Sequence, residues 1–205
     1  MFDNINIVLV NTSHPGNIGS TARAMGVMGF NKLSLVQPKD FPSELATAMA
    51  VGCDKILDSA RVYPDLSNAL SESSLNIGFS ARSRKESIPT LSVDECIDKI
   101  LTNNEITYNI IFGNEKNGLS NEELLMCDYI VTLPTASFYS SLNLSAAVQI
   151  FTYELLKKSL DDPTSNSKSQ KNINLAKTKD KELFYKKLID ILKETDFVTE
   201  KNSKS

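Results

Sequence analysis

Three short segments of the chain combine glycine with polar residues in patterns that suit ligand binding. The first, NTSHPGNIGSTARAMGVMGF (residues 11–30), holds four of the eight glycines, the only histidine and Arg23. Gly16 and Gly19 would let the backbone approach a ligand closely, and free N–H groups at a helix start favour an anion. A tight turn followed by a solvated arginine explains this segment equally well.

The second segment, FGNEKNGLS (residues 112–120), has the glycine spacing of a phosphate-binding loop at Gly113 and Gly118. Leu119 stands where such a loop needs lysine, which argues against a nucleoside triphosphatase. A glycine turn remains, with one carboxylate, Glu115, in its bend. Taken alone, Glu115 is better explained as a solvated acid.

The third segment, LPTASFYSSLNLSAAVQ (residues 133–149), leaves a strand at Pro134 and enters a helix. Ser140, Ser141 and Asn143 are ordinary helix-capping residue types. All three segments follow expected strands, and open α/β sheets bind ligands at the carboxyl ends of their strands. The sequence therefore predicts one shared site.

Alternating strands and helices must position these segments. We expect strands at 5–10, 32–36, 75–80, 107–113 and 129–133, and helices at 17–29, 43–51, 92–102, 120–127 and 142–159. This alternation predicts an α/β fold, a parallel sheet with helices on both faces. Ser120 and Glu123 have the spacing of a capping box. The last helix has an apolar face for packing on the sheet, made of Leu144, Ala147, Val148, Phe151 and Leu155.

The composition divides the chain into residues 1–160, a single domain, a polar linker at 161–180 and a helical tail at 181–205. Within the tail, residues 181–197 place an apolar stripe along one helix face, made of Leu183, Phe184, Leu188, Ile189 and Leu192. Such a helix is expected either to dock on the domain or to meet a partner.

Charge and cysteine usage limit the possible partners. The net charge is −3, but residues 1–150 carry ten basic against sixteen acidic side chains, whereas residues 151–205 carry twelve against nine. A basic tail permits contact with RNA. Three distant cysteines fit neither a disulfide framework nor a CxxC metal site, so we expect a reducing cytoplasm and no metal. The start, MFDNINIVLV, predicts a strand rather than a leader or membrane span.

The three segments, read as NTSHPGNIGSTARAMGVMGF, FGNEKNGLSNEEL and SSLNLSAAVQI, resemble the three motifs of the SpoU branch of the SPOUT RNA methyltransferases. Within that branch the chain resembles the TrmJ-like tRNA 2′-O-methyltransferases, and GFSARSR (residues 78–84) is similar to their intermediate loop. The resemblance covers about residues 5–157.

This resemblance implies a C-terminal trefoil knot, which general topology rules would not predict. It also implies a cytoplasmic homodimer that uses S-adenosylmethionine as methyl donor. The implied acceptor is the ribose 2′-hydroxyl of tRNA nucleotide 32, a C or U in the anticodon loop. Another tRNA position or rRNA remains an alternative.

Individual residues match the family's site. The resemblance implies a cofactor site made of Phe79, Ser80, Ala81, Gly113, Leu133, Ser140, Ser141 and Leu142, with room at Gly113 where backbone meets ligand. It implies a polar catalytic cluster made of Asn17, Arg23, Glu115, Ser141 and Asn143. Asn114 stands where TrmJ-like enzymes usually have arginine, and TAS (residues 135–137) replaces an Asn-Pro-Glu-like stretch. Both departures bear on the choice of RNA.

Two other classes of function compete with methyl transfer. GNIG (residues 16–19) could clamp RNA as a KH-type loop does in a non-catalytic binding module. A nucleotide-binding α/β regulator would explain the sheet and its glycines. Neither accounts for all three motifs. For the reaction itself, Arg23 is expected to clamp phosphate and ribose, because a guanidinium resists deprotonation and is a poor general base. A role of Arg23 as the general base is the alternative.

Overall fold

The computed structural model describes residues 2–81, 88–138, 140–161 and 175–195. Its strands form one parallel sheet in the order β3-β2-β1-β6-β4-β7-β5. Their bounds are β1 Ile5–Val10, β2 Lys32–Val36, β3 Arg61–Tyr63, β4 Leu75–Phe79, β5 Thr90–Leu91, β6 Tyr108–Phe112 and β7 Tyr129–Val131. The predicted α/β class with a parallel sheet is confirmed.

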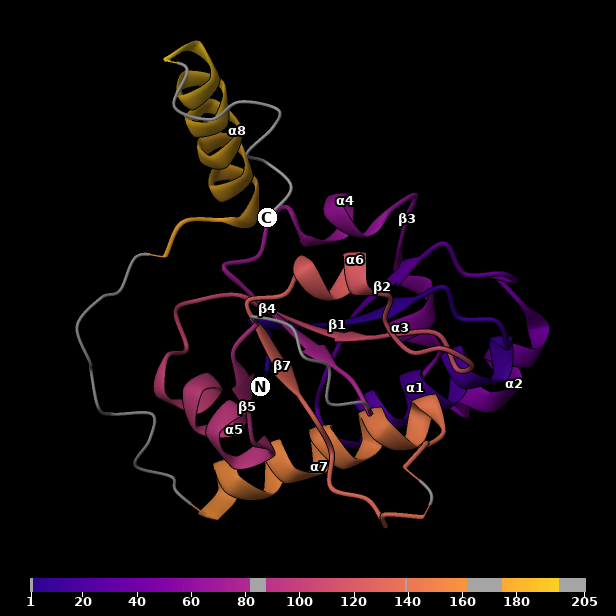
Figure 1. The fold of residues 1–205 in the computed structure, drawn as a ribbon. Helices are drawn as coiled ribbons and strands as arrows, with labels where there is room; N and C mark the ends of the chain where they lie inside the picture. The colour runs from indigo at the N-terminus through magenta and orange to yellow at the C-terminus, as the bar shows by residue number, and fades with distance from the viewer. Residues whose placement is uncertain (1, 82–87, 139, 162–174, 196–205) are drawn as a thin grey trace.

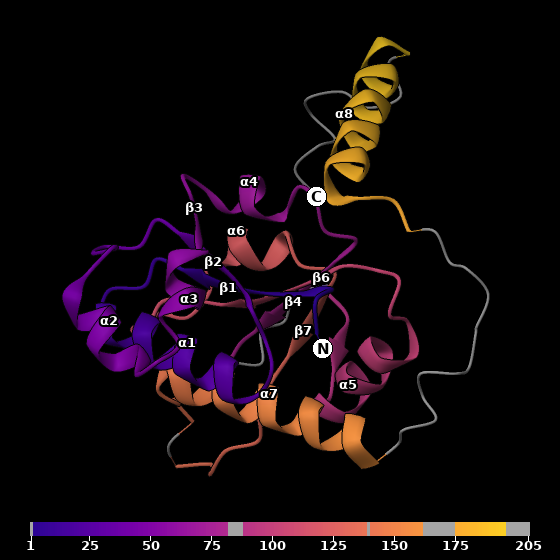
Figure 2. The same ribbon diagram turned by 180° about the vertical axis from the view of Figure 1, so that it is seen from behind.

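Helices cover both faces of this sheet (Figures 1 and 2). Their bounds are α1 Pro15–Val27, α2 Glu44–Ala50, α3 Asp54–Asp58, α4 Leu66–Leu70, α5 Val93–Thr102, α6 Asn121–Leu125, α7 Leu144–Asp161 and α8 Thr178–Glu194. The long helices α1 and α7 lie on one face with α5, and the short helices α4 and α6 lie on the other. Helix α8 stands out from the body.

The alternation of side chains along β1 divides the core in two. Ile5, Ile7 and Leu9 point into the larger cluster under α1 and α7. Val8 and Val10 point into a smaller cluster that α4 and α6 cover. Such alternation follows from the two-residue repeat of a strand, and burial on both faces explains why β1 is almost continuously apolar.

The predicted helices and strands all occur; β1 and β2 have the predicted ends, and the ends of the others are shifted. Helix α1 begins at Pro15 instead of residue 17, because proline is favoured at a first helical position and His14 caps the helix. The capping box of Ser120 and Glu123 is present at α6. The apolar face predicted for α7 packs on the larger core cluster.

Four short elements, β3, β5, α3 and α4, were not predicted from the sequence. Each has between two and five residues, too few to show a period. The tail helix starts at Thr178, three residues earlier than expected, and most of the predicted linker, residues 162–174, lies outside the described residues, as do residues 196–205. No helix in the described part of the chain is long and apolar enough to span a membrane.

Candidate functional site

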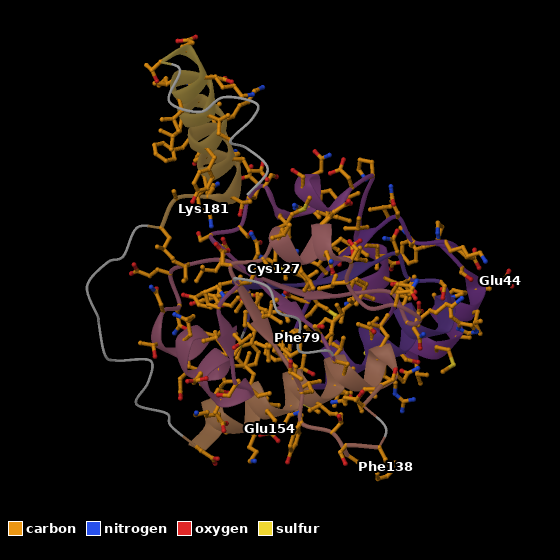
Figure 3. The ribbon with its side chains drawn as sticks, in the orientation of Figure 1. Glu44, Phe79, Cys127, Phe138, Glu154 and Lys181 are labelled. Atoms are coloured by element: carbon orange, nitrogen blue, oxygen red, sulfur yellow. The ribbon has the colours of Figure 1, made fainter. Side chains whose placement is uncertain are left out.

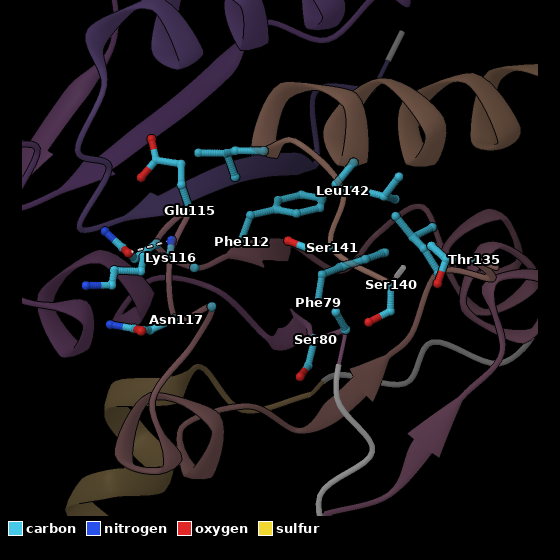
Figure 4. Close-up of a pocket in the computed structure, with 17 residues that line it drawn as sticks. Phe79, Ser80, Phe112, Glu115, Lys116, Asn117, Thr135, Ser140, Ser141 and Leu142 are labelled. Atoms are coloured by element: carbon cyan, nitrogen blue, oxygen red, sulfur yellow. Dashed lines mark hydrogen bonds between the residues drawn. The ribbon is translucent and has the colours of Figure 1, made fainter. Parts of the chain in front are cut away.

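A pocket opens at the carboxyl ends of β4, β6 and β7, where the second and third predicted segments meet. Its volume is about 210 Å³. All residues that the sequence assigned to the cofactor line it: Phe79, Ser80, Ala81, Gly113, Leu133, Ser140, Ser141 and Leu142. In Figure 4 the loop bearing Glu115, Lys116 and Asn117 lies on one side of the hollow, and Thr135 and Ser140 lie on the other.

Aromatic rings give the pocket an apolar side. The rings of Phe79 and Phe112 stack with their centroids 4.7 Å apart. Phe151 of α7 meets Phe79 edge-on at 5.1 Å, which ties these rings to the larger core cluster. An apolar side next to serine hydroxyls and loop backbone is the usual make-up of a small-molecule site.

Two glycines of the first two segments, Gly19 and Gly113, lie against the protein's own backbone. A Cβ on Gly113 would lie 2.2 Å from the carbonyl carbon of Gly118 and from the nitrogen of Leu119. A Cβ on Gly19 would lie 2.0 Å from the carbonyl oxygen of Ala46 in α2. On the Cβ side of both residues, neighbouring backbone fills the space that a side chain would take, while Gly113 also lines the pocket.

Glu115 joins the first segment to the second. Its carboxylate accepts hydrogen bonds from the backbone N–H and the hydroxyl of Ser13, at 2.9 and 2.8 Å. It also accepts from the His14 N–H at 3.2 Å and from the Asn17 amide at 2.9 Å. Four donors on one carboxylate fix the position of the loop that carries it.

Asn143 brings the third segment into the same network. Its amide donates to the Asn17 side-chain oxygen at 3.0 Å. Its own oxygen accepts from the backbone N–H of Ser145 at 3.0 Å, so Asn143 also caps α7. We call Ser13, His14, Asn17, Glu115 and Asn143 the Glu115 cluster. Asn143 therefore both caps α7 and bonds to Asn17 in the site.

The charge state of Glu115 follows from this network. Partial burial alone would raise the pKa of its carboxyl group, but hydrogen bonds from Asn17 and Ser13 outweigh burial. They hold the pKa below the ordinary value of 4.5. At neutral pH Glu115 is therefore ionised and a weak base, and its four bonds make it a group that positions the loops.

Arg23 makes no hydrogen bond to the described residues of the cluster. It is exposed on α1, and within the described residues it has no hydrogen bond or ion pair. Of the five residues predicted for catalysis, the structure brings Asn17, Glu115 and Asn143 into contact, and Ser141 lines the neighbouring pocket. The lone histidine, His14, accepts a hydrogen bond from the Gly16 N–H and caps α1.

Several residues of the site were not predicted from the sequence. Ser13 was not singled out because its partner, Glu115, lies 102 residues away. Phe112, Thr135 and Ala147 line the pocket as well. The only local signal for Phe112 was its place at the end of a strand, directly before Gly113.

Side chains that could ligate a metal or act as thiol nucleophiles are scattered or buried in the described part of the chain. Among the described residues there is no group of three or more His, Cys, Asp and Glu side chains that could hold a metal ion. Burial raises the pKa of both Cys96 and Cys127 to about 12, so these thiols stay protonated at neutral pH.

Known proteins are similar to this chain in sequence and in fold. Residues 4–153 match the profile of the SpoU rRNA methylase family. The tRNA (cytidine/uridine/adenosine-2′-O-)-methyltransferase TrmJ of Pseudomonas aeruginosa (strain UCBPP-PA14) is 44% identical over 206 residues, covering 93% of this chain and 79% of that protein.

Solved structures are similar as well. TrmJ from Z. mobilis ZM4 superimposes with a TM-score of 0.81 at 28% identity, covering 94% of this chain and 81% of that one. The SpoU methyltransferase AviRb from Streptomyces viridochromogenes, solved with the cofactor AdoMet, gives 0.63 at 22% identity, covering 78% and 59%, and shows the fold alone. The chain therefore belongs to the SpoU methylase family and, within it, groups with the TrmJ methyltransferases.

Proposed function

We propose that this protein transfers a methyl group from S-adenosylmethionine to a ribose 2′-hydroxyl of tRNA, at the C or U of nucleotide 32. The observation that carries the proposal is the pocket at the carboxyl ends of the strands, which all the expected cofactor residues line and which Glu115 connects to the cluster. The name of the P. aeruginosa relative supports tRNA and the 2′-oxygen. Nucleotide 32 rests on the motif resemblance.

The residues present fit this cofactor. Phe79, Phe112 and Leu142 offer apolar surface for an adenine ring, while Ser140 and Ser141 offer hydroxyls beside it. The AdoMet in the AviRb structure supports the same donor in this fold. When bound, S-adenosylmethionine supplies the methyl group on a sulfonium that is already a good leaving group. The main task of the chain is then in-line positioning, which is worth several kcal/mol.

The cluster and Arg23 have different tasks in this proposal. The 2′-hydroxyl is a weak acid and must lose its proton during attack. Glu115 is a weak base occupied by four donors, so we assign it the positioning of Asn17 and of the loop backbone. Arg23, free of partners within the described residues, clamps the ribose and its phosphate and stabilises the developing oxyanion. Arg23 as the general base is the alternative.

The assembly remains part of the proposal. A cytoplasmic homodimer and a trefoil knot rest on the resemblance of the motifs. A tail that helps hold tRNA rests on the same resemblance and on the excess of lysine after residue 150. The parallel sheet, with strands on both sides of β1 and β6, supports a methyltransferase over a KH-type binding module.

Mapping ribose methylation tests the function directly. Mass spectrometry of tRNA and rRNA from cells with and without this protein should show loss of a 2′-O-methyl group at nucleotide 32 of specific tRNAs. Loss at another tRNA position, or in rRNA, would replace the assigned target. Unchanged methylation of all RNA would reject the activity and favour a binding module.

Calorimetric titration tests the pocket. S-adenosylmethionine should bind, and ATP and NAD should not. Ala147→Leu fills part of the lining from α7 and should weaken S-adenosylmethionine binding at least tenfold. The matched control is Ala146→Leu, on the same helix but outside the lining, which should keep the wild-type affinity. Equal affinity of both folded variants would remove this pocket as the cofactor site.

A further inference from the structure

The tail helix α8 docks at the opposite end of the sheet from the pocket. Its first turn meets the turn at residues 71–73, directly before β4, and Figure 3 shows Lys181 at the base of the helix. The backbone N–H of Thr178 donates to the Ser73 carbonyl at 2.9 Å, and that of Lys179 donates to the Ser71 carbonyl at 3.2 Å.

These two bonds replace an ordinary helix cap. The first N–H groups of a helix have no partner within it, and a side chain at the N-cap position usually satisfies one of them. The N-cap residue of α8 is Lys177, which makes no such bond. The 71–73 turn of the methyltransferase domain therefore caps the tail helix.

Ion pairs surround the same turn. Lys177 and Lys179 both contact Glu72, at 2.7 and 2.6 Å, and Lys181 contacts Asp128 at 2.9 Å. Glu72 lies beside the start of α8, where a negative charge also interacts favourably with the helix dipole. Its hydrogen bonds to Lys177 and Lys179 lower the pKa of Glu72 to about 2.

A row of polar side chains crosses the sheet and ends on the tail helix. Ser34 donates to Asn6 at 3.1 Å, Asn6 to Asn109 at 2.8 Å, and Asn109 to Asn76 at 3.1 Å. The Asn76 amide then donates to the Thr178 hydroxyl at 2.9 Å, and Thr178 donates to the Ser73 carbonyl at 3.1 Å. The four donors from Ser34 to Asn76 all point toward α8, and Thr178 donates back to the 71–73 turn.

Burial makes the last bond of the row important. Asn76 is 1% exposed and Thr178 7% exposed. A buried amide without an acceptor costs about 1–3 kcal/mol. The sheet therefore depends on the Thr178 hydroxyl to satisfy Asn76, just as the helix depends on the 71–73 turn for its cap.

Among the described residues, α8 makes few contacts beyond its first turn. Phe184, Tyr185 and Ile191 are 61%, 60% and 55% exposed. Isolated helices of about this length are marginal in water, because nucleation is unfavourable. The docked first turn therefore supplies contacts that an isolated 17-residue helix would lack.

We propose that Thr178 and the 71–73 turn are positioning elements that hold α8 as a fixed arm and so set how the protein grips tRNA. This inference rests on the proposed function. Docking uses Lys177, Lys179 and Lys181, so the arm offers its remaining lysines, Lys186, Lys187 and Lys193, to RNA phosphates. Each of these three is exposed and without an ion pair among the described residues.

Hydrogen exchange of the full-length protein tests the anchor without any RNA. Thr178→Val keeps the volume and removes the hydroxyl, and Thr178→Ser keeps the hydroxyl. Thr195→Val is the matched control, because within the described part of the chain the Thr195 hydroxyl bonds only to carbonyls of its own helix. Amides of α8 should exchange at least tenfold faster in Thr178→Val and at the wild-type rate in the other two. Wild-type protection of α8 in Thr178→Val would overturn the anchor.

Kinetics with tRNA test the positioning role. Thr178→Val should raise KM for tRNA about tenfold, leave kcat and S-adenosylmethionine affinity unchanged, and be rescued by Thr178→Ser. A wild-type KM in a variant whose α8 exchanges rapidly would overturn the positioning of tRNA. If the wild-type protein methylates no tRNA, the proposed function fails, while hydrogen exchange still decides whether Thr178 anchors α8.

Discussion

At the carboxyl ends of the strands, one ionised carboxylate, Glu115, accepts four hydrogen bonds from residues 13–17 and so joins two loops; at the amino ends, a row of neutral asparagines fixes one helix. The first arrangement lies at a partly exposed edge and leaves a pocket beside it. The second is buried, with Asn76 and Asn109 only 1% and 3% exposed.

The difference follows from the cost of burying charge. A neutral amide can be buried when its hydrogen bonds are satisfied, whereas an ionised carboxylate loses far more free energy when it leaves water. A carboxylate can therefore organise loops only at an edge, which is where a substrate must enter. A buried amide row suits a permanent attachment such as that of α8.

The largest expected effect is on the methylation rate, and it concerns Arg23 in the region at the carboxyl ends of the strands. Arg23→Ala should lower single-turnover methylation of tRNA, with both substrates saturating, by roughly 10² to 10³, the scale for one lost charge-stabilising donor. Arg23→Lys should recover only a small part, because lysine lacks the planar fork. Stability should not change, since Arg23 has no partner among the described residues. A wild-type rate in Arg23→Ala would show that Arg23 is a solvated surface residue with no role in catalysis.

The next effect concerns the turn that carries Glu115. Gly113→Ala should destabilise the protein by about 1–3 kcal/mol, since its Cβ would overlap the backbone of Gly118 and Leu119. Urea unfolding measures this change. Unchanged stability would show that the backbone of Gly118 and Leu119 moves aside freely. The turn would then not require glycine at position 113.

Glu115→Gln tests the charge of the cluster itself. The amide places a donor opposite the donors of Ser13 and Asn17 and should cost about 1 kcal/mol. Because folding lowers the pKa of Glu115, its contribution is present above pH 4.5 and is lost as the pH falls below that value. Urea unfolding from pH 7 to pH 3 should show a weaker pH dependence in the variant. Glu122→Gln, an exposed neighbour, is the control, and equal curves for the two variants would contradict the assignment.

The smallest effect concerns the tail. Replacing Lys186 and Lys187 together by alanine should lower the slope of log affinity for tRNA against log salt by about two. S-adenosylmethionine affinity and α8 protection should stay unchanged, because neither lysine takes part in docking. Filter binding across a salt series measures the slope. An unchanged slope would mean that the arm does not meet phosphate through these lysines.

Much of the fold was predictable because its signals are local. The apolar runs of β1 and β2, the capping box at Ser120 and the apolar stripe of α7 each depend on residues within about one helix or strand. Strands β3 and β5 and helices α3 and α4 are too short for such a period, and only their packing reveals them. The cofactor residues came from the motif resemblance, and the structure gathers them around one pocket.

The sequence by itself determined the element types, the family motifs and the basic character of the tail. Only the tertiary structure decided that Ser13 meets Glu115, that Asn76 meets Thr178, and that Gly113 faces its own loop. The first two contacts join residues about a hundred positions apart, so they depend on strand order and register. A single chain carries no local signal for such contacts, because each partner alone is an ordinary polar residue satisfied equally well by water.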